Sequence, residues 1–527
     1  MRLIQSVTRC VLTMIGCVMN PIINLMYSFI YQYDKRSVPP IKDPVLCQSA
    51  MALAKKIRSR ELKAVDVMGL FIARVNEVNP LTNAVVADRF NEAIEEAVKV
   101  DTMLDEGNVS DKFSEKNAPL LGVPLSVKEA FAVKGMPNSS GLVARRNFIA
   151  NFDAVAVAKL RAAGAIPFVM TNTSELCMWL ESANNVYGRT RNPYNLSRIV
   201  GGSSGGEGCN ISSGAAVIGI GSDIGGSIRM PCFFNGIYGH RSSRGSVSNE
   251  GQHPPATAGQ QVLLSTGPMC RYSEDLLPML KLMSGNPPEL KLDELVDVKT
   301  LQFFTMEDDT GSLFLSNVDP QLKACQQKAV DYLEESLGVS VTRVGIRRMK
   351  YSLEMWSSKM ATAHGTPFAS LMAEETGSVN CATELLKWVV GRSDHTLPAI
   401  GLGLVEKLDY LRESYHPKFL DMLEKLELKL QEMLGDNGVL LYPTHPVIAP
   451  YHNQPLLTPF NFAYTGIFNA LGLPVTQCPV GLSKEGLPVG FQIVGSMNGD
   501  RQTIAVARHV EEGLGGWVPP GAVSYHQ

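Results

Sequence analysis

The sequence predicts an α/β fold, in which helices pack on the faces of a β-sheet. Apolar runs of β-like composition alternate along the chain with segments of helical periodicity, a pattern typical of a sheet covered by helices. In addition, a polar, glycine-rich loop directly follows one apolar run, and a lysine follows another. Because chemistry in such sheets usually lies at strand ends, the pattern also predicts a catalytic site there.

The individual elements follow from this alternation. Apolar side chains recur at helical spacing in residues 52–78, and residues 90–104 form a second helical segment rich in Ala, Glu and Lys. Late in the chain, residues 459–474 contain an aromatic-rich helix that ends at Gly472. The remaining predicted elements are a helix at residues 154–164 and strands at residues 119–127, 165–171, 215–221, 438–442 and 490–495.

The composition is globular and excludes several classes of function. Of the 527 residues, 45% are hydrophobic and 19% charged, and the net charge of −3 gives no overall positive field for nucleic acid. Ten cysteines occur without a Cys-x-x-Cys pair, and nine histidines without a His-Glu-x-x-His motif. We therefore predict no nucleic-acid partner, no metal, no disulfide framework and no cofactor.

Residues 1–34 are predicted to anchor the chain to a membrane. Residues 10–33 carry no charge and would span about 36 Å as a helix, enough for a bilayer core. A proline and two asparagines in the middle of the segment leave both a single pass and a monotopic hairpin open. The alternatives are a cleaved signal peptide and a buried core helix. Residues 35–44, with two adjacent prolines, are predicted to be a linker.

Two glycine-rich loops carry serines, and a lysine lies upstream of both. The loop at residues 201–208 contains Ser203, the loop at residues 223–229 contains Ser227, and Lys128 follows a predicted strand. Glycines let a backbone turn several N–H groups toward one point, where they stabilise the oxyanion that forms when a serine attacks a carbonyl. A buried lysine loses its proton readily and then serves as the base. The alternatives are ordinary turns or a phosphate cradle, but neither loop has the Gly-Lys-Ser/Thr of a phosphate loop.

In order, spacing and flanking residues, these motifs resemble those of the amidase signature family, whose enzymes use a Ser-Ser-Lys triad. By position, Ser227 corresponds to the nucleophile and Lys128 to the terminal base. Ser203 corresponds to the bridging serine, which the family holds after a cis peptide bond. The resemblance implies a relay in which Lys128 takes a proton from Ser203 and Ser203 takes one from Ser227. The acyl-enzyme on Ser227 is then hydrolysed by water.

The resemblance also implies the surroundings of the triad and the architecture. Ser204 and Asp223 are expected to brace the loops, and Arg229 either braces the same loop or forms a plain salt bridge. The implied fold is a mixed, twisted sheet between helical layers, in a single catalytic domain at residues 45–520. The implied oxyanion hole consists of the backbone N–H groups of Ile224, Gly225, Gly226 and Ser227.

Several stretches resemble one branch of the family, the fatty-acid amide hydrolase 2 group. The branch implies a small-molecule lipid substrate, a long-chain fatty acid amide cleaved to acid and amine, and a membrane location on endomembranes or lipid droplets. It admits a homodimer, and the oligomeric state stays open. The alternatives are an amidotransferase-type or general acyl amidase, and a non-catalytic lipid-binding protein on the same fold. The stretches are residues 135–141, 174–179, 230–236, 459–466 and 473–479.

Two further features have two interpretations each, and a third departs from the family pattern. Met178 and Trp179 are predicted either to line an acyl channel or to belong to the core. Residues 385–405 contain two short apolar runs, which include Trp388 and Ile400 and either lie at a membrane interface or pack into the core. At residues 240–243 the chain has His-Arg-Ser-Ser where the family usually has Lys-Pro, and the missing proline is expected to loosen the loop.

Overall fold

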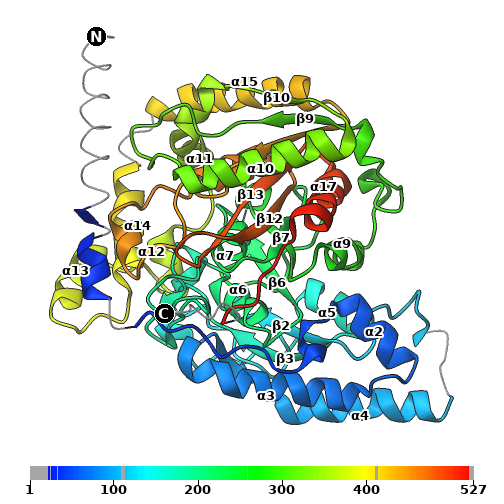
Figure 1. The fold of residues 1–527 in the computed structure, drawn as a ribbon. Helices are drawn as coiled ribbons and strands as arrows, with labels where there is room; N and C mark the ends of the chain where they lie inside the picture. The colour runs from blue at the N-terminus through cyan, green and yellow to red at the C-terminus, as the bar shows by residue number, and fades with distance from the viewer. Residues whose placement is uncertain are drawn as a thin grey trace.

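The computed structural model describes residues 22–23, 25–31, 34–107, 113–257, 259–409 and 414–521. Within this part of the chain, eleven strands form one sheet in the order β1-β3-β2-β6-β8-β7-β12-β13-β11-β9-β10 (Figure 1). The sheet is mixed, because β2 is parallel to β3 and β6, β9 is parallel to β10 and β11, and the other neighbours are antiparallel. Its strands are β1 (Val85–Asp88), β2 (Pro124–Lys128), β3 (Ile166–Thr171), β6 (Ile218–Asp223), β7 (Tyr238–Arg241), β8 (Ser265–Cys270), β9 (Gln302–Thr305), β10 (Val341–Arg343), β11 (Gly438–Tyr442), β12 (Val475–Leu482) and β13 (Pro488–Gly495); β4 (Ala183–Asn184) and β5 (Gly188–Arg189) pair separately.

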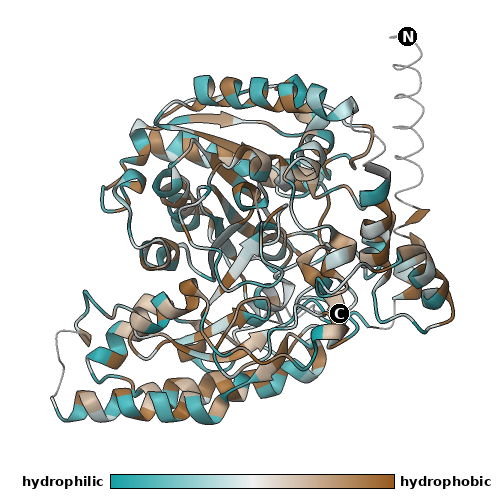
Figure 2. Ribbon diagram, turned by 180° about the vertical axis from the view of Figure 1, so that it is seen from behind, coloured by the Kyte–Doolittle hydropathy of each residue, from teal (hydrophilic) through white to brown (hydrophobic). Residues whose placement is uncertain are grey.

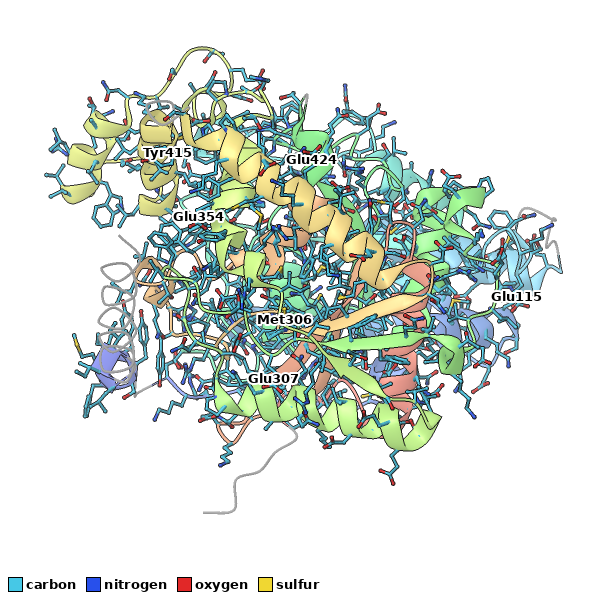
Figure 3. All side chains as sticks on the ribbon, turned by 90° about the horizontal axis from the view of Figure 1, so that it is seen from above. Glu115, Met306, Glu307, Glu354, Tyr415 and Glu424 are labelled. Carbon is cyan, nitrogen blue, oxygen red and sulfur yellow. The ribbon has the colours of Figure 1, made fainter. Side chains whose placement is uncertain are left out.

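Helices cover both faces of this sheet, which confirms the predicted α/β fold with a mixed sheet. Every residue of β2, β6, β8, β11 and β13 is buried, and successive side chains of a strand point to opposite faces. From above, α15 crosses the top of the molecule with Glu424 on it, and Glu354 lies on the neighbouring α11 (Figure 3). The helices are α2 (Ala50–Arg58), α3 (Ala64–Thr82), α4 (Phe90–Asp105), α5 (Val155–Ala162), α6 (Gly205–Ser212), α7 (Arg229–Phe234), α8 (Gln260–Leu263), α9 (Leu276–Ser284), α10 (Pro320–Leu337), α11 (Ser352–Ala361), α12 (Phe368–Leu371), α13 (Cys381–Val389), α14 (Leu397–Asp409), α15 (His416–Leu434), α16 (Ala463–Leu471) and α17 (Asp500–Leu514).

The prediction of one continuous helix at residues 52–78 was wrong. The chain turns between α2 and α3, where Arg60 has a left-handed backbone with φ of 64°. The carboxylate of Asp101 then accepts hydrogen bonds from the N–H groups of Ala64 and Val65, each at 2.9 Å. A carboxylate at this place satisfies N–H groups that have no partner inside the helix, and it interacts favourably with the helix dipole. The new start of α3 is therefore set by a residue on α4, far along the chain.

Other predicted elements occur in the structure, some with shifted ends and some with the predicted ends. The strand predicted at residues 119–127 begins only at Pro124, because residues 119–122 form a turn in which Gly122 has φ of 77°. The strand predicted at residues 438–442 is β11, with the same ends. The aromatic-rich helix is α16, and it ends at Gly472 in a left-handed conformation, as predicted.

Helices α12, α13 and α14 form a small unit, which we call the cap. Buried side chains of the cap form a hydrophobic cluster separate from the main core, and this cluster also includes Leu142 and Leu176. The outer surface of the cap is apolar, since Leu386, Val389 and Val390 are each 66–72% exposed. Figure 2 shows hydrophobic ribbon on this side of the molecule.

The predicted anchor lies mostly outside the described residues. Of residues 1–34, the structure describes 22–23, 25–31 and 34, and residues 25–30 are helical. Across the part of the chain that is described, no helix combines the length and the apolar character needed to cross a membrane. Tyr27 and Tyr31 stack on Tyr451, which follows β11, at centroid distances of 6.4 and 5.9 Å, whereas Leu25 and Phe29 are exposed. In Figures 1 and 3 this helical segment and the cap lie on the same side of the molecule.

Candidate active site

Lys128 is the last residue of β2, and its side chain is fully buried. Its Nζ lies 2.8 Å from Ser203 Oγ and 3.0 Å from Ser222 Oγ. Burial lowers the pKa of Lys128 below its ordinary value, and the nearby Cys177 and Asp223 oppose that shift in part. A lowered pKa favours the neutral amine, whose lone pair accepts a proton.

Ser203 lies in the first glycine loop, just before α6. The peptide bond between Gly202 and Ser203 is cis, in agreement with the expectation from the family. The Ser203 carbonyl accepts hydrogen bonds from Thr173 Oγ1 at 2.8 Å and Ser182 Oγ at 3.2 Å. A Cβ on Gly202 would lie 2.1 Å from the carbonyl oxygen of Trp179. Glycine is therefore required here, because the loop passes directly over a neighbouring backbone.

Ser204 joins the first glycine loop to the second. Its N–H donates to the carbonyl of Ser227 at 3.1 Å, and it precedes the first residue of α6. Ser227 itself is 8% exposed and is the most accessible of the three proposed triad residues. Its hydroxyl makes no hydrogen bond to any residue that the structure describes. Catalytic hydrogen bonds often tighten only when substrate is bound.

A buried ion pair organises the second glycine loop. Arg229 donates from Nε and Nη2 to the two carboxylate oxygens of Asp223, each at 3.0 Å. The same carboxylate accepts the N–H groups of Gly226 at 2.7 Å and Ile228 at 3.1 Å. Although burial alone would raise it, the guanidinium of Arg229 holds the pKa of Asp223 well below its usual range. Asp223 therefore stays ionised and fixes the direction of the loop.

This arrangement changes the set of donors available to an oxyanion. The N–H of Gly226 was expected in the oxyanion hole, but it is taken by Asp223 Oδ1 at 2.7 Å. The N–H groups of Ile224, Gly225 and Ser227 have no hydrogen-bond partner among the described residues. These three donors lie within four consecutive residues of the loop that contains Ser227, and they remain available for a developing negative charge.

Sequence reasoning missed several residues at this site. Ser222 is the second neighbour of the Lys128 amine, and the Cys177 thiol is near enough to act on the pKa of Lys128. Glu207 of α6 is fully buried, its Oε1 accepts from Thr171 Oγ1 at 2.8 Å, and burial raises its pKa to about 8. Ser222 directly precedes Asp223 and Glu207 lies inside the first glycine motif, so proximity in sequence was an available signal for both.

The apolar residues near the proposed site differ in how much of their surface is exposed. Met178 and Trp179 are half-buried, with Met178 against the cap cluster and Trp179 against the main core. Phe233 and Phe234 are fully buried in the main core, which leaves them no surface for a substrate.

Of the two residues singled out in the region 385–405, Trp388 is exposed whereas Ile400 is fully buried.

At residues 240–243, where the family usually has Lys-Pro, hydrogen bonds hold the segment, which argues against the expected loosening of the loop. Asp500 at the start of α17 accepts the N–H of Ser243 at 2.8 Å and lies 3.0 Å from His240 Nε2. Ser242 Oγ pairs with Ser265 Oγ at 2.7 Å. All four residues of the segment are fully buried.

Within the described residues, no group of three or more His, Cys, Asp or Glu side chains could hold a metal ion. Lys128, Ser203 and Ser227 provide a basic amine and two hydroxyls, and the backbone of the second glycine loop adds free N–H groups. Such a set suits nucleophilic attack by a serine on a carbonyl, with proton transfer through the second hydroxyl.

Comparison with known proteins gives the family. The Amidase family model matches residues 66–504. The chain is 54% identical to fatty-acid amide hydrolase 2-A of Danio rerio over 92% of each chain, and 52% identical to fatty-acid amide hydrolase 2 of Homo sapiens over 93% of each chain. A solved structure described as fatty acid amide hydrolase has a TM-score of 0.71 at 24% identity, covering 90% of this chain and 86% of that one, which supports the fold. The chain therefore belongs to the amidase signature family and is an amide hydrolase.

Proposed function

We propose that this enzyme is membrane-associated and cleaves long-chain fatty acid amides to free fatty acid and amine through a Ser-Ser-Lys triad. The observation that carries the proposal is the contact between the fully buried Lys128 amine and Ser203 Oγ, at 2.8 Å. Ser203 is in turn followed by Ser204, whose N–H holds the backbone of Ser227. The three proposed triad residues thus come from adjoining segments of one buried site.

The proposed reaction begins with neutral Lys128. Its lone pair takes the Ser203 hydroxyl proton while Ser203 takes the proton of Ser227, and Ser227 Oγ attacks the amide carbonyl. The N–H groups of Ile224, Gly225 and Ser227 stabilise the oxyanion. The proton returns through Ser203 to the departing amine, because an amide nitrogen leaves poorly unless protonated. Water then hydrolyses the acyl-enzyme by the same relay.

Two features support a fatty acyl substrate. Met178 and Trp179 are only half-buried, and the backbone of Trp179 passes close to Gly202, the residue before Ser203. Relatives that are 52–54% identical are named fatty-acid amide hydrolases. Membrane association is supported by the exposed apolar side chains on the cap and on residues 25–30, which lie on one side of the molecule (Figure 1). A bilayer on that side would present a lipid substrate next to the cap.

The test is acid release from a series of amides that share one amine and differ in acyl length. We expect kcat/KM to rise with chain length and Ser227→Ala to lose all turnover. A rate that is independent of acyl length would leave an amidase but would remove the fatty acid amide assignment.

A further inference from the structure

A short segment between the cap and Lys128 has an unusual backbone. The 3-10 turn η4 (Glu175–Cys177) leads into Met178 and Trp179, which are proposed to contact the acyl chain. Leu176 and Cys177 are consecutive non-glycine residues with left-handed φ values of 51° and 61°. Each such residue costs energy and persists only where its surroundings hold it. We call residues 175–179 the acyl loop.

Contacts with the cap help to hold the acyl loop in this conformation. Glu175 Oε1 is 2.7 Å from His395 Nδ1, and Glu175 Oε2 accepts the N–H of Thr396 at 2.7 Å. Glu175 and His395 are 3% and 7% exposed. Thr396 directly precedes α14, so the carboxylate lies where a helix favours negative charge. The Glu175 carboxylate therefore holds the start of α14 with both oxygens.

The next residue of the acyl loop enters the cap itself. The Leu176 side chain is fully buried in the cap cluster, together with Phe368 of α12 and Ile400 of α14. Its N–H donates to the Ser140 carbonyl at 2.8 Å, on the side of the catalytic domain. The acyl loop is thus held between the cap and the catalytic domain, and its next residue, Cys177, is near enough to Lys128 to act on the pKa of that lysine.

We propose that Glu175 and His395 form a latch through which the cap positions the acyl loop for long acyl chains. This inference rests on the proposed function, because it places the acyl chain beside Met178. Glu175 and His395 are positioning residues, since neither lies among the groups proposed to react. When the latch is broken, the acyl loop loses its support from α14, and the enzyme loses its preference for long chains while the relay remains in place.

The chain offers a matched control in a second ion pair between the cap and the catalytic domain. Arg145 Nη1 lies 2.8 Å from Glu374 Oε1, just after α12. The Arg145 side chain otherwise contacts the carbonyl of Asn138 and the ring of Phe148, and neither residue belongs to the acyl loop. Breaking this ion pair removes one contact between the cap and the catalytic domain and leaves the contact between Glu175 and His395 intact.

The experiment measures labelling rates of the full chain with two fluorophosphonates, one with an ethyl and one with a hexadecyl chain. Rates are expressed per active site by titration, and the readout is the ratio of the long-chain to the short-chain rate. In His395→Leu and Glu175→Gln we expect this ratio to fall about tenfold, the size of effect typical for a lost positioning interaction. His395→Asn, whose side-chain N–H can replace Nδ1, should recover most of the ratio, and Arg145→Ala should keep it.

The proposal is overturned if the latch variants slow both probes equally, or if Arg145→Ala changes the ratio as much as they do. If His395→Leu does not fold, Glu175→Gln and His395→Asn give the same comparison. Hydrogen exchange supplies a second measurement, in which the acyl loop amides should exchange faster in Glu175→Gln and unchanged exchange counts against the latch. Because the probes need no amide, failure of the fatty acid amide assignment would appear separately, as absent acid release with the probe ratio intact.

Discussion

The centre of the site and the cap are held in different ways. Around Ser227, the charges of Asp223 and Arg229 are fully buried, paired with each other and bonded to neighbouring backbone. The cap has its own small hydrophobic cluster, and large apolar side chains such as Leu386 remain exposed. This difference agrees with our proposal, in which the groups that react are fixed in the core and a separate unit contacts lipid. The variants below test each side of that division.

The largest effect is expected at Ser227. Ser227→Ala removes the proposed nucleophile, so amide turnover and fluorophosphonate labelling should both disappear, while the fold is kept because the side chain makes no hydrogen bond to a described residue. Active-site labelling followed by gel fluorescence measures this. Full labelling of the variant would move the nucleophile to another residue.

Lys128→Ala should lower kcat by about a hundredfold or more, the range typical for loss of a general base. Because burial lowers the pKa of Lys128, the wild-type rate should rise with pH as the amine loses its proton and then level off. The residual rate of the variant should lack this rise to a plateau and should depend more steeply on the hydroxide concentration. A pH–rate profile of both proteins decides the point, and a wild-type rate that is flat from acid to alkaline pH argues against a lysine base.

Asp223→Asn should mainly reduce stability, since it leaves the Arg229 charge buried without its counter-charge. We expect a loss of about 3–5 kcal/mol in the free energy of unfolding. Asp421→Asn at the exposed pair with Lys425 should cost at most about 1 kcal/mol. Urea denaturation at neutral pH measures the free energy of unfolding of both variants. Equal losses would mean that the buried Asp223–Arg229 pair stabilises the fold no more than an exposed pair does.

The pH dependence of stability also tests whether Asp223 is ionised in the folded protein. The folded-state pKa of Asp223 is held below its ordinary value, so its stabilisation is complete above the unfolded pKa of about 3.9 and declines as the pH falls further. Asp223→Asn should therefore lose less stability than the wild type on acidification. A steeper loss in the variant would contradict the ionised state of Asp223.

How far the sequence could predict this site depends on where each contact originates. Lys128, Ser203 and Ser227 lie in contiguous motifs that resemble a family pattern, so they were found together. Cys177 was not, because its approach to Lys128 depends on two left-handed residues in η4 that no local pattern indicates. The taking of the Gly226 N–H by Asp223 likewise depends on side-chain geometry inside the loop.

Some elements of the fold could not be predicted from the sequence for similar reasons. The strands β7 and β8 contain Gly, Pro, His, Arg, Ser and Thr, so neither is an apolar run, and both were overlooked. In the cap, the apolar pattern of residues 385–405 could not separate Trp388, which is exposed, from Ile400, which is buried. Trp388 lies on α13 and Ile400 on α14, and Ile400 packs with Leu176 and Phe368 in the cap cluster, so the distinction is decided by tertiary packing.

The smallest effect on catalysis is expected on the outer surface of the cap. In Leu386→Ser combined with Val389→Ser, binding to liposomes should fall several-fold because exposed apolar surface is lost, while kcat on a water-soluble amide stays within about twofold. Leu295→Ser, at a leucine that is 99% exposed and lies outside the cap, is the matched control and should leave liposome binding unchanged. Equal losses in both proteins would show that the cap is not a specific docking face.

The most direct test of the central claim is to trap the acyl-enzyme during turnover of a long-chain fatty acid amide. The reaction is quenched in acid, the protein is digested, and the peptides are examined by tandem mass spectrometry. We predict the mass of the fatty acyl group on the Ser227 hydroxyl, and its absence from Lys128→Ala quenched at the same time. An acyl group on Ser203 or Cys177, or continued acid release without any adduct on Ser227, would contradict the proposed mechanism.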